Sequence, residues 1–345
     1  QPEVSQGTLQ AIFEYQTMIC ELTGMDVSNA SMYDGATAFA EAAFMAARVT
    51  RRSKIVVSGG VHPEWIDVLT TYAASGLIDV TVVPFGDGVT ETADIAAELD
   101  DTVAAVLVAS PNFVGTLEDL GAIGEAAHAV GALFVVATNP VLLGVMEPPA
   151  IFGADIVVGE GQSLGNGLSF GGPGLGFFTC RQTYVRQMPG RLVGRTVDVD
   201  GNDAFVLTLS TREQHIRREK ATSNICSNHA LNALAAGAYL SAVGREGLAD
   251  IATASMAKAR YLRGKLIETG KFSAPWDVPF GYEFALAYEG EADEMYAALL
   301  QKGYLAGTIL STADEDDPRD LILFAVTEKR TKAEMDAFCE EVASL

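Results

Sequence analysis

The segment Ala104–Ala137 reads AAVLVASPNFVGTLEDLGAIGEAAHAVGALFVVA and decides the fold class of the chain. It contains two continuous apolar runs, Ala104–Ala109 and Ala132–Ala137, separated by the Ala-rich amphipathic stretch Leu117–Val130. Continuous apolar strands are typical of a sheet that is buried on both faces, and a helix between two such strands is typical of a parallel crossover connection. The segment therefore predicts a strand–helix–strand unit of a parallel α/β sheet.

The same alternation extends over the first two-thirds of the chain. The other predicted strands are Asn29–Met32, Lys54–Ser58, Val80–Phe85, Asp155–Gly159 and Gly176–Cys180. The other predicted helices are Thr37–Val49, Pro63–Ser75 and Thr92–Leu99. Only a Gly-rich loop precedes the last strand. This strand could therefore enter the sheet in the antiparallel direction. The pattern predicts a large, mostly parallel sheet of seven strands.

The pattern changes after Arg181, where a charged stretch precedes two long helices and a small α+β unit. The elements predicted there are the helices Asn228–Val243, Gly247–Glu268, Ala292–Lys302 and Lys332–Ala343 and the strands Glu283–Tyr288, Tyr304–Leu310 and Leu321–Thr327. The acidic run Asp314–Asp317 predicts a solvated loop. Because breaker residues gather in Ser273–Gly281, we expect a large α/β domain over 1–270 and a small α+β domain over 271–345.

The composition excludes several classes of partner. The 345 residues include 45 acidic and 23 basic side chains, which gives a formal net charge of −22. Such a surface repels phosphate backbones and anionic membranes, so we expect no nucleic-acid or membrane partner. No stretch resembles a membrane span or a signal peptide. The four cysteines are widely spaced and form no metal-ligand pattern, so we expect reduced thiols, no metal and a cytoplasmic location.

A first candidate site is Asp34-Gly35-Ala36-Thr37, which follows a short strand and opens a helix. Gly35 and Ala36 let the backbone approach a ligand, helix N-terminal amides attract anions, and Thr37 adds a hydroxyl. One interpretation is a cup for a phosphate group. The other is an ordinary helix start with Asp34 as its N-cap, and the spacing alone favours this second interpretation.

Further polar residues follow the predicted strands, at the edge where open α/β sheets bind ligands. His62 could stack on a planar ring there, or it could simply begin a surface helix. Asn112 follows one strand, and Thr138 and Asn139 follow the next. Each could be ordinary turn chemistry, but two such strand ends in succession favour a site. The Gly-rich segment 159–174 carries apolar anchors, which predicts unusual turns rather than a disordered loop.

The densest polar run of the chain is 211–226. Its candidate residues are Arg212, Arg217, Arg218, Lys220 and Asn224. In such an acidic chain, a cluster of cations could bind a carboxylate or a phosphate, or it could face a partner protein. The alternative is a solvated helix of mixed charge.

Four segments give the chain a family resemblance over essentially its whole length. They are QPEVSQG at 1–7, SMYDGATA at 31–38, FGGP at 170–173 and TREQHIRREKATSNIC at 211–226. The chain resembles the P-protein family of the glycine cleavage system, and within it the first subunit of the two-subunit form. The run 211–226 is highly specific to that family. Since QPEVSQG lies inside the chain in the family, the missing initial Met predicts an N-terminally truncated sequence.

The resemblance implies the fold type I architecture of pyridoxal-phosphate (PLP) enzymes, with a seven-stranded sheet and a smaller C-terminal domain. It also implies one part of a heteromeric oxidoreductase of glycine catabolism. The assembled enzyme decarboxylates glycine on PLP and transfers the aminomethyl group to the lipoyl arm of the H-protein. The implied partners are a homologous catalytic subunit 2, in a heterodimer or a heterotetramer, together with glycine and the lipoylated H-protein.

One departure from the family pattern concerns the lysine that forms a Schiff base with PLP. The catalytic subunit has a His-Lys pair where the resemblance places Gln162 and Ser163 in this chain. None of the eight lysines lies between Lys54 and Lys220. Nor does an Asp stand at 137–139 to pair with the pyridine nitrogen. We therefore expect PLP on the partner subunit, and here a cleft without a covalent anchor, formed by Gly35, Ala36, Thr37, His62, Asn112, Thr138 and Asn139.

Three functions remain open at this point. The first is the subunit that does not anchor PLP, inactive by itself, which completes the active site with its partner. The second is a non-catalytic pseudoenzyme or regulatory module, in which Gly35–Thr37, His62 and Arg212 bind a small carboxylate or phosphate. The third is an independent PLP enzyme, which the missing lysine disfavours.

Overall fold

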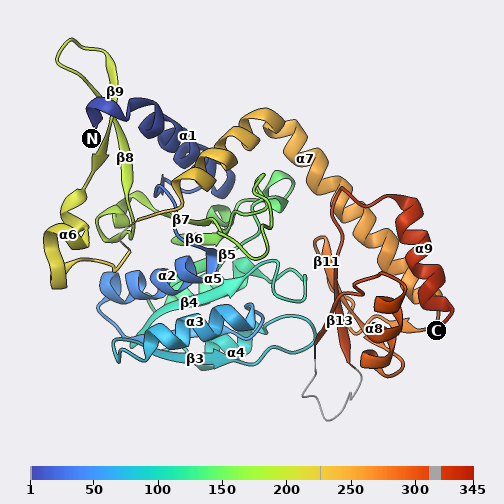
Figure 1. The fold of residues 1–345 in the computed structure, drawn as a ribbon. Coiled ribbons are helices and arrows are strands. Elements are labelled where there is room, and N and C mark those ends of the chain that lie inside the picture. The colour runs from blue at the N-terminus through green and yellow to red at the C-terminus, as the bar shows by residue number, and fades with distance from the viewer. Residues whose placement is uncertain (1, 226, 311–319) are drawn as a thin grey trace.

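The computed structural model describes residues 2–225, 227–310 and 320–345. Its largest sheet has the strand order β1-β7-β6-β5-β4-β2-β3 (Figure 1). The strands are β1 (Val27–Ser28), β2 (Lys54–Ser58), β3 (Asp79–Val83), β4 (Val103–Ala109), β5 (Leu133–Ala137), β6 (Ile156–Glu160) and β7 (Gly176–Cys180). Strands β3, β2, β4, β5 and β6 are parallel, whereas β7 pairs antiparallel with both β6 and β1. The mostly parallel seven-stranded sheet is thus confirmed, with its last strand antiparallel.

Helices pack against both faces of this sheet. They are α1 (Gln6–Thr23), α2 (Gly35–Thr50), α3 (Pro63–Ala73), α4 (Thr92–Ala97) and α5 (Leu120–Ala129). Every residue of β4 and β5 is buried, which explains why both strands are continuously apolar. Side chains alternate between the faces, so Val106 and Leu107 belong to two different core clusters. No helix in the described ranges is long and apolar enough to cross a membrane.

The first strand differs from the sequence prediction. The strand expected at Asn29–Met32 is wrong: β1 comprises Val27–Ser28, and Met32 contributes only an isolated bridge to Gly176. The physical reason lies in Ser31, whose φ of 143° is incompatible with a strand. The chain therefore leaves the sheet before Met32 and turns toward the start of α2.

The stretch between the large sheet and the long helices contains elements that the sequence did not predict. An antiparallel hairpin of β8 (Leu192–Val197) and β9 (Asp203–Thr208) projects from the body beside the N-terminus (Figure 1). A short helix, α6 (Gln214–Arg217), follows the hairpin. The 3-10 helices in the described part of the chain are η1 (Pro2–Val4), η2 (Leu142–Gly144), η3 (Pro149–Phe152), η4 (Gln182–Gln187), η5 (Ser210–Arg212) and η6 (Arg218–Lys220).

Helix α7 (Ala230–Glu268) runs from the large sheet to a second, antiparallel sheet of order β10-β11-β13-β12 (Figure 1). Gly244 breaks α7 with a φ of 63°, between the two helices predicted there. The C-terminal elements are β10 (Phe272–Ser273), β11 (Glu283–Tyr288), α8 (Ala292–Gln301), β12 (Thr308–Leu310), β13 (Leu321–Ala325) and α9 (Lys332–Ala343). The loop predicted at Asp314–Asp317 lies outside the described residues. The domain division at residue 270 stays a prediction.

Close backbone contacts around Gly115 join the two sheets. The N–H of Gly281 donates to the carbonyl of Gly115 at 2.9 Å, and the N–H of Leu117 donates to the carbonyl of Pro279 at 3.0 Å. A Cβ atom on Gly115 would lie 2.0 Å from the carbonyl oxygen of Glu283, and its φ is 89°, so only glycine fits. This approach places the start of β11 against the carboxyl ends of the parallel strands.

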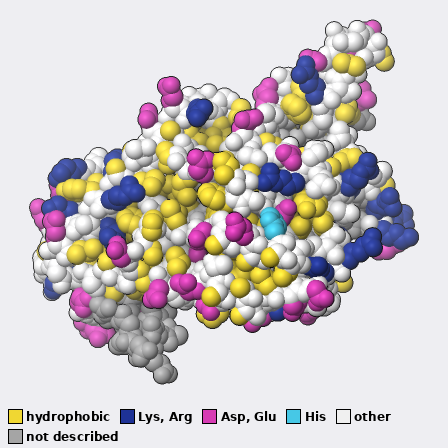
Figure 2. All heavy atoms as spheres, turned by 180° about the vertical axis from the view of Figure 1, so that it is seen from behind, with side chains coloured by type: hydrophobic (Ala, Val, Ile, Leu, Met, Phe, Trp, Pro, Cys, Tyr) yellow, Lys and Arg dark blue, Asp and Glu magenta, His cyan; other side chains and the backbone are white. Residues whose placement is uncertain are grey.

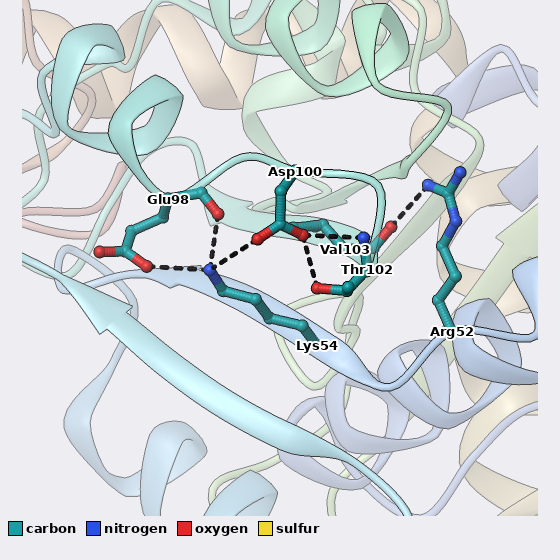
Figure 3. Close-up of polar contacts among 6 residues, drawn as sticks. All are labelled: Arg52, Lys54, Glu98, Asp100, Thr102 and Val103. Carbon is teal, nitrogen blue, oxygen red and sulfur yellow. Dashed lines mark hydrogen bonds and ion pairs between the residues drawn. The ribbon is translucent and has the colours of Figure 1, made fainter.

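The opposite edge of the sheet is held by Arg52 and Lys54, at the start of β2 (Figure 3). The ammonium of Lys54 donates to the carbonyl of Glu98 at 2.7 Å and to its carboxylate at 3.0 Å. Arg52 donates to the carbonyls of Val103 and Val130 at 2.9 Å each. Lys54 is thus held at the end of β2 opposite to the edge where the sequence predicts a site.

Candidate functional site

A cavity of about 550 Å³ lies where the parallel strands end and the second sheet begins. Its lining residues come from the ends of β4, β5 and β6, the start of α3 and the second sheet: His62, Pro63, Glu64, Trp65, Ala109, Pro111, Asn112, Phe113, Ala137, Thr138, Asn139, Glu160, Glu283, Thr308 and Leu323. The structure thus brings together four residues that the sequence analysis selected, His62, Asn112, Thr138 and Asn139. Their common position follows from parallel strands whose carboxyl ends share one edge.

His62 forms part of the cavity wall and caps α3. Its Nδ1 accepts the N–H of Glu64 at 3.2 Å, so a neutral ring carries its proton on Nε2. The ring packs against Phe113 with centroids 4.5 Å apart. Burial lowers the pKa of His62, and the nearby carboxylate of Glu64 offsets this only in part. The imidazole is therefore a neutral aromatic wall at pH 7.

Asn112 is buried and its side chain serves the loop that contains it. The amide group donates to the carbonyl of Gly88 at 3.1 Å and to the carboxylate of Glu118 at 2.8 Å. The amide oxygen accepts the N–H groups of Val114 and Thr116. All of these bonds lie within the protein, so Asn112 shapes the cavity rather than offering a free polar group to a ligand.

Thr138 and Asn139 are similarly engaged. The Thr138 hydroxyl donates to the carbonyl of Ser110 at 2.8 Å. Asn139 donates to the hydroxyl of Tyr282, and its oxygen accepts the N–H of Val141 at 3.0 Å. Burial raises the pKa of Tyr282 to about 12, so its hydroxyl stays protonated. These contacts connect the end of β5 to the second sheet.

The start of α2 has a different arrangement from an open phosphate cup. The N–H of Gly35 donates to the Glu160 carboxylate at 3.0 Å, and the N–H of Thr37 donates to Asp34 at 2.7 Å. A Cβ atom on Gly35 would lie 2.4 Å from the indole of Trp65. Gly35, Ala36 and Thr37 are absent from the cavity lining of the described residues. Asp34 is the N-cap, as the helix-start interpretation expected.

Glu160 joins the start of α2 to the Gly-rich segment. Besides Gly35, its carboxylate accepts the N–H groups of Gln162 at 2.9 Å and Leu175 at 2.7 Å. A carboxylate therefore already occupies the place where helix dipole and backbone amides would attract a ligand anion. Ser163, the residue matched to the Schiff-base lysine, is exposed and does not line the cavity.

The cavity is acidic. Its lining contains the carboxylates of Glu64, Glu160 and Glu283 and, among the described residues, no Lys or Arg. Sequence reasoning missed Glu283, because only the fold of the Gly115 region carries the start of β11 to this edge. It also missed Glu160 as a functional residue, although the glutamate stands at a strand end beside a Gly-rich segment.

The candidate residues of the basic run 211–226 differ in burial. Arg212 is buried and donates to the carbonyls of Met188, Leu209 and Gly190, so it holds the chain rather than a ligand. Arg217, Arg218, Lys220 and Asn224 are exposed. Figure 2 shows Lys and Arg side chains together at the end of the molecule where α6 lies.

The other large cavity of the described residues is separate from these side chains. A second cavity of about 780 Å³ lies between α1, η4 and the hairpin, and it contains none of the predicted site residues. Within the described parts of the chain, no group of His, Cys, Asp and Glu residues could hold a metal ion.

Comparisons with known proteins agree with this architecture. A chain described as glycine decarboxylase (P-protein) of the glycine cleavage system, in inhibitor-bound form, superposes with a TM-score of 0.94 at 46% identity, over 100% of this chain and 77% of that one. A glutamate decarboxylase of Lactobacillus brevis has a TM-score of 0.76 at 16% identity, covers 98% of this chain and 79% of its own, and shares the fold alone. The PLP fold type I class is thus confirmed.

Curated relatives point the same way. A protein of Chlorobium phaeobacteroides named "Probable glycine dehydrogenase (decarboxylating) subunit 1" is 54% identical over all of this chain and 77% of its own length. A protein of the same name from Carboxydothermus hydrogenoformans is 52% identical over 99% of this chain and 76% of its own length. The family model for the glycine cleavage system P-protein matches residues 1–342. The chain therefore belongs to the P-protein family of the glycine cleavage system.

Proposed function

We propose that this chain is the subunit of a decarboxylating glycine dehydrogenase that does not hold PLP. A homologous catalytic subunit carries the cofactor, and the assembled enzyme decarboxylates glycine and transfers the aminomethyl group to the lipoyl arm of the H-protein. The observation that carries the proposal is the carboxylate of Glu160, which occupies the start of α2 in a cavity with no Lys or Arg among its described lining residues.

The residues present do not fit PLP. A phosphate group at the N-terminus of α2 would compete with Glu160 for the Gly35 amide. Two like unit charges about 4 Å apart repel each other by about 4 kcal/mol at an effective dielectric constant of 20. The glycine carboxylate would meet the same acidic lining. Lys54, which is held at the far end of β2, cannot supply the missing amine.

The exposed cations of α6 and η6 are the surface that we propose for partner contacts. Arg217, Arg218 and Lys220 form a basic patch on a chain whose net charge is −22. A local patch of opposite sign steers association and fixes its orientation. We propose that it faces the catalytic subunit in a cytoplasmic heterodimer or heterotetramer, a location that the free Cys20, Cys180 and Cys339 support.

The test compares this chain alone, the catalytic subunit alone and the two mixed. The measurements are glycine-dependent carbon dioxide exchange with lipoylated H-protein, and borohydride reduction in the presence of PLP. We expect full exchange only from the mixture, and a reduced PLP adduct only on the catalytic subunit. Full exchange activity from this chain alone, or a reduced adduct on it, would contradict the proposal.

A further inference from the structure

Among the described lining residues, Glu283 is the acidic one that comes from the second sheet. Among the described residues, no hydrogen bond or ion pair engages its carboxylate. Glu283 is partly buried, and this burial raises the pKa of its carboxyl group. Glu160, in the same lining, accepts three backbone N–H groups. Unlike Glu160, Glu283 therefore has no hydrogen-bond donor for its carboxylate among the described residues.

Three aromatic side chains line the same cavity as Glu283. His62 and Phe113 are packed together, Trp65 lies against Gly35, and all three rings line the cavity. Faces of aromatic rings attract cations, with the largest effect for Trp. Because the His62 ring is neutral, it adds no opposing charge. A cavity lined by aromatic rings and a carboxylate matches the chemistry of an ammonium group.

The volume fits a small ligand. About 550 Å³ lies within the range of small-molecule sites. Thr308 stands exposed in the lining, on the second sheet. Among the described lining residues, no Lys or Arg competes with a ligand cation for Glu283.

We propose that this cavity binds a primary alkylammonium group, with the carboxylate of Glu283 as its counter-ion and the rings of His62, Trp65 and Phe113 as its walls. A ligand cation would neutralise the partly buried charge of Glu283, whereas a carboxylate or phosphate ligand would add to the repulsion. The proposal does not depend on the subunit role, since it concerns this chain's own cavity. The ammonium could belong to a free amine or to a lysine side chain of another protein.

Trp65 provides the readout. The chain has two tryptophans, so the Trp276→Phe variant leaves Trp65 as the only indole. In this background, n-pentylamine and cadaverine are titrated as free amines, and Nα-acetyl-lysine methylamide as a model of a protein lysine. Neutral 1-pentanol and anionic pentanoate serve as chemical controls.

We expect saturable changes in Trp65 fluorescence with the amines and none with the two controls. Preference for the lysine model over free amines would assign the protein source, and the reverse would assign free amines.

Two cavity variants and one matched control complete the test. Glu283→Gln should weaken amine binding at least tenfold, whereas Glu125→Gln, on the exposed face of α5, should change it less than twofold. Thr308→Lys places a competing ammonium at an exposed position and should also abolish binding without disturbing the core. Unchanged binding in Glu283→Gln or Thr308→Lys, equal binding of pentanoate, or no saturation by any amine would overturn the proposal.

Discussion

Glu160 and Glu283 lie in one cavity and yet have opposite surroundings. The first carboxylate accepts the N–H groups of Gly35, Gln162 and Leu175. The second has no such donor among the described residues, and burial raises its pKa. Removing an ion from water without giving it a partner costs stability. The contrast separates a structural carboxylate from one that is available to a ligand.

The substitution Glu283→Gln should raise the free energy of unfolding of the unliganded protein above that of the unsubstituted chain. This gain should be larger at pH 7.5 than at pH 4.5. The folded pKa lies above the unfolded pKa, so the unfolded chain loses its proton first and stability falls as the pH rises through this interval. The neutral amide removes this penalty. Glu64 and Glu160, which line the same cavity, and the preceding residue Tyr282 are present in both proteins.

Urea unfolding at the two pH values measures the effect as a difference between variant and unsubstituted chain. Glu125→Gln, which alters an exposed carboxylate of α5, should give the same difference at both pH values. A Glu283→Gln variant that is less stable than the unsubstituted chain at pH 7.5 would show that the carboxylate has a stabilising partner.

The sequence could predict the positions of some cavity residues but not their hydrogen bonds. His62, Asn112, Thr138 and Asn139 were found because each follows a strand that reads clearly as apolar. Their bonding could not be predicted. The amide of Asn112 is engaged by loop residues, and that of Asn139 by Tyr282, which lies 143 positions away in sequence. Strand ends specify where residues lie, whereas tertiary contacts specify which of their atoms remain free.

Among the elements, the hairpin β8–β9 depends most on its neighbours. Two-stranded ribbons are marginal on their own, and this one projects from the body (Figure 1). It is held by α1: Gln6 exchanges two hydrogen bonds with the backbone of Phe205, and Gln16 does the same with Val193. Neither α1 nor the hairpin was predicted, because their apolar residues are interspersed with polar ones and their order arises from packing on each other. Continuous apolar strands such as β4 can be predicted without knowing what they pack against.

Replacing Gln16 with Ala should destabilise the protein by about 2 kcal/mol, because a buried N–H and a buried carbonyl of Val193 lose their partners together. Replacing Gln6 with Ala removes the corresponding pair from a partly exposed position, where water can substitute, and should cost less than about 1 kcal/mol. Urea unfolding gives the two values, and hydrogen exchange reports the hairpin directly. Equal losses in the two variants would mean that burial of Val193 is not what matters.

At the scale of the whole molecule, charge is distributed unevenly. A net charge of −22 makes general attraction to another acidic protein unfavourable. Figure 2 shows that cations nevertheless gather where α6 lies. Arg217, Arg218 and Lys220 are exposed there, while Arg212 is turned inward and fixes the segment to the core. Arg212 thus fixes the position of the segment that carries the exposed cations, as the proposed partner surface requires.

The double substitution Arg217→Glu, Arg218→Glu should weaken association with the catalytic subunit at least tenfold at low salt, mainly through a slower association rate. Charge reversal at an interface converts steering attraction into repulsion, and salt screens both. The difference between variant and unsubstituted chain should therefore shrink when the ionic strength rises from 50 to 500 mM. Surface plasmon resonance at the two salt concentrations measures the association and dissociation rates.

Arg245→Glu, a charge reversal at an exposed position of α7, is the matched control and should leave the rates within twofold. Equal weakening by this control would attribute the effect to net charge alone, and an unchanged association rate in the double variant would place the interface elsewhere.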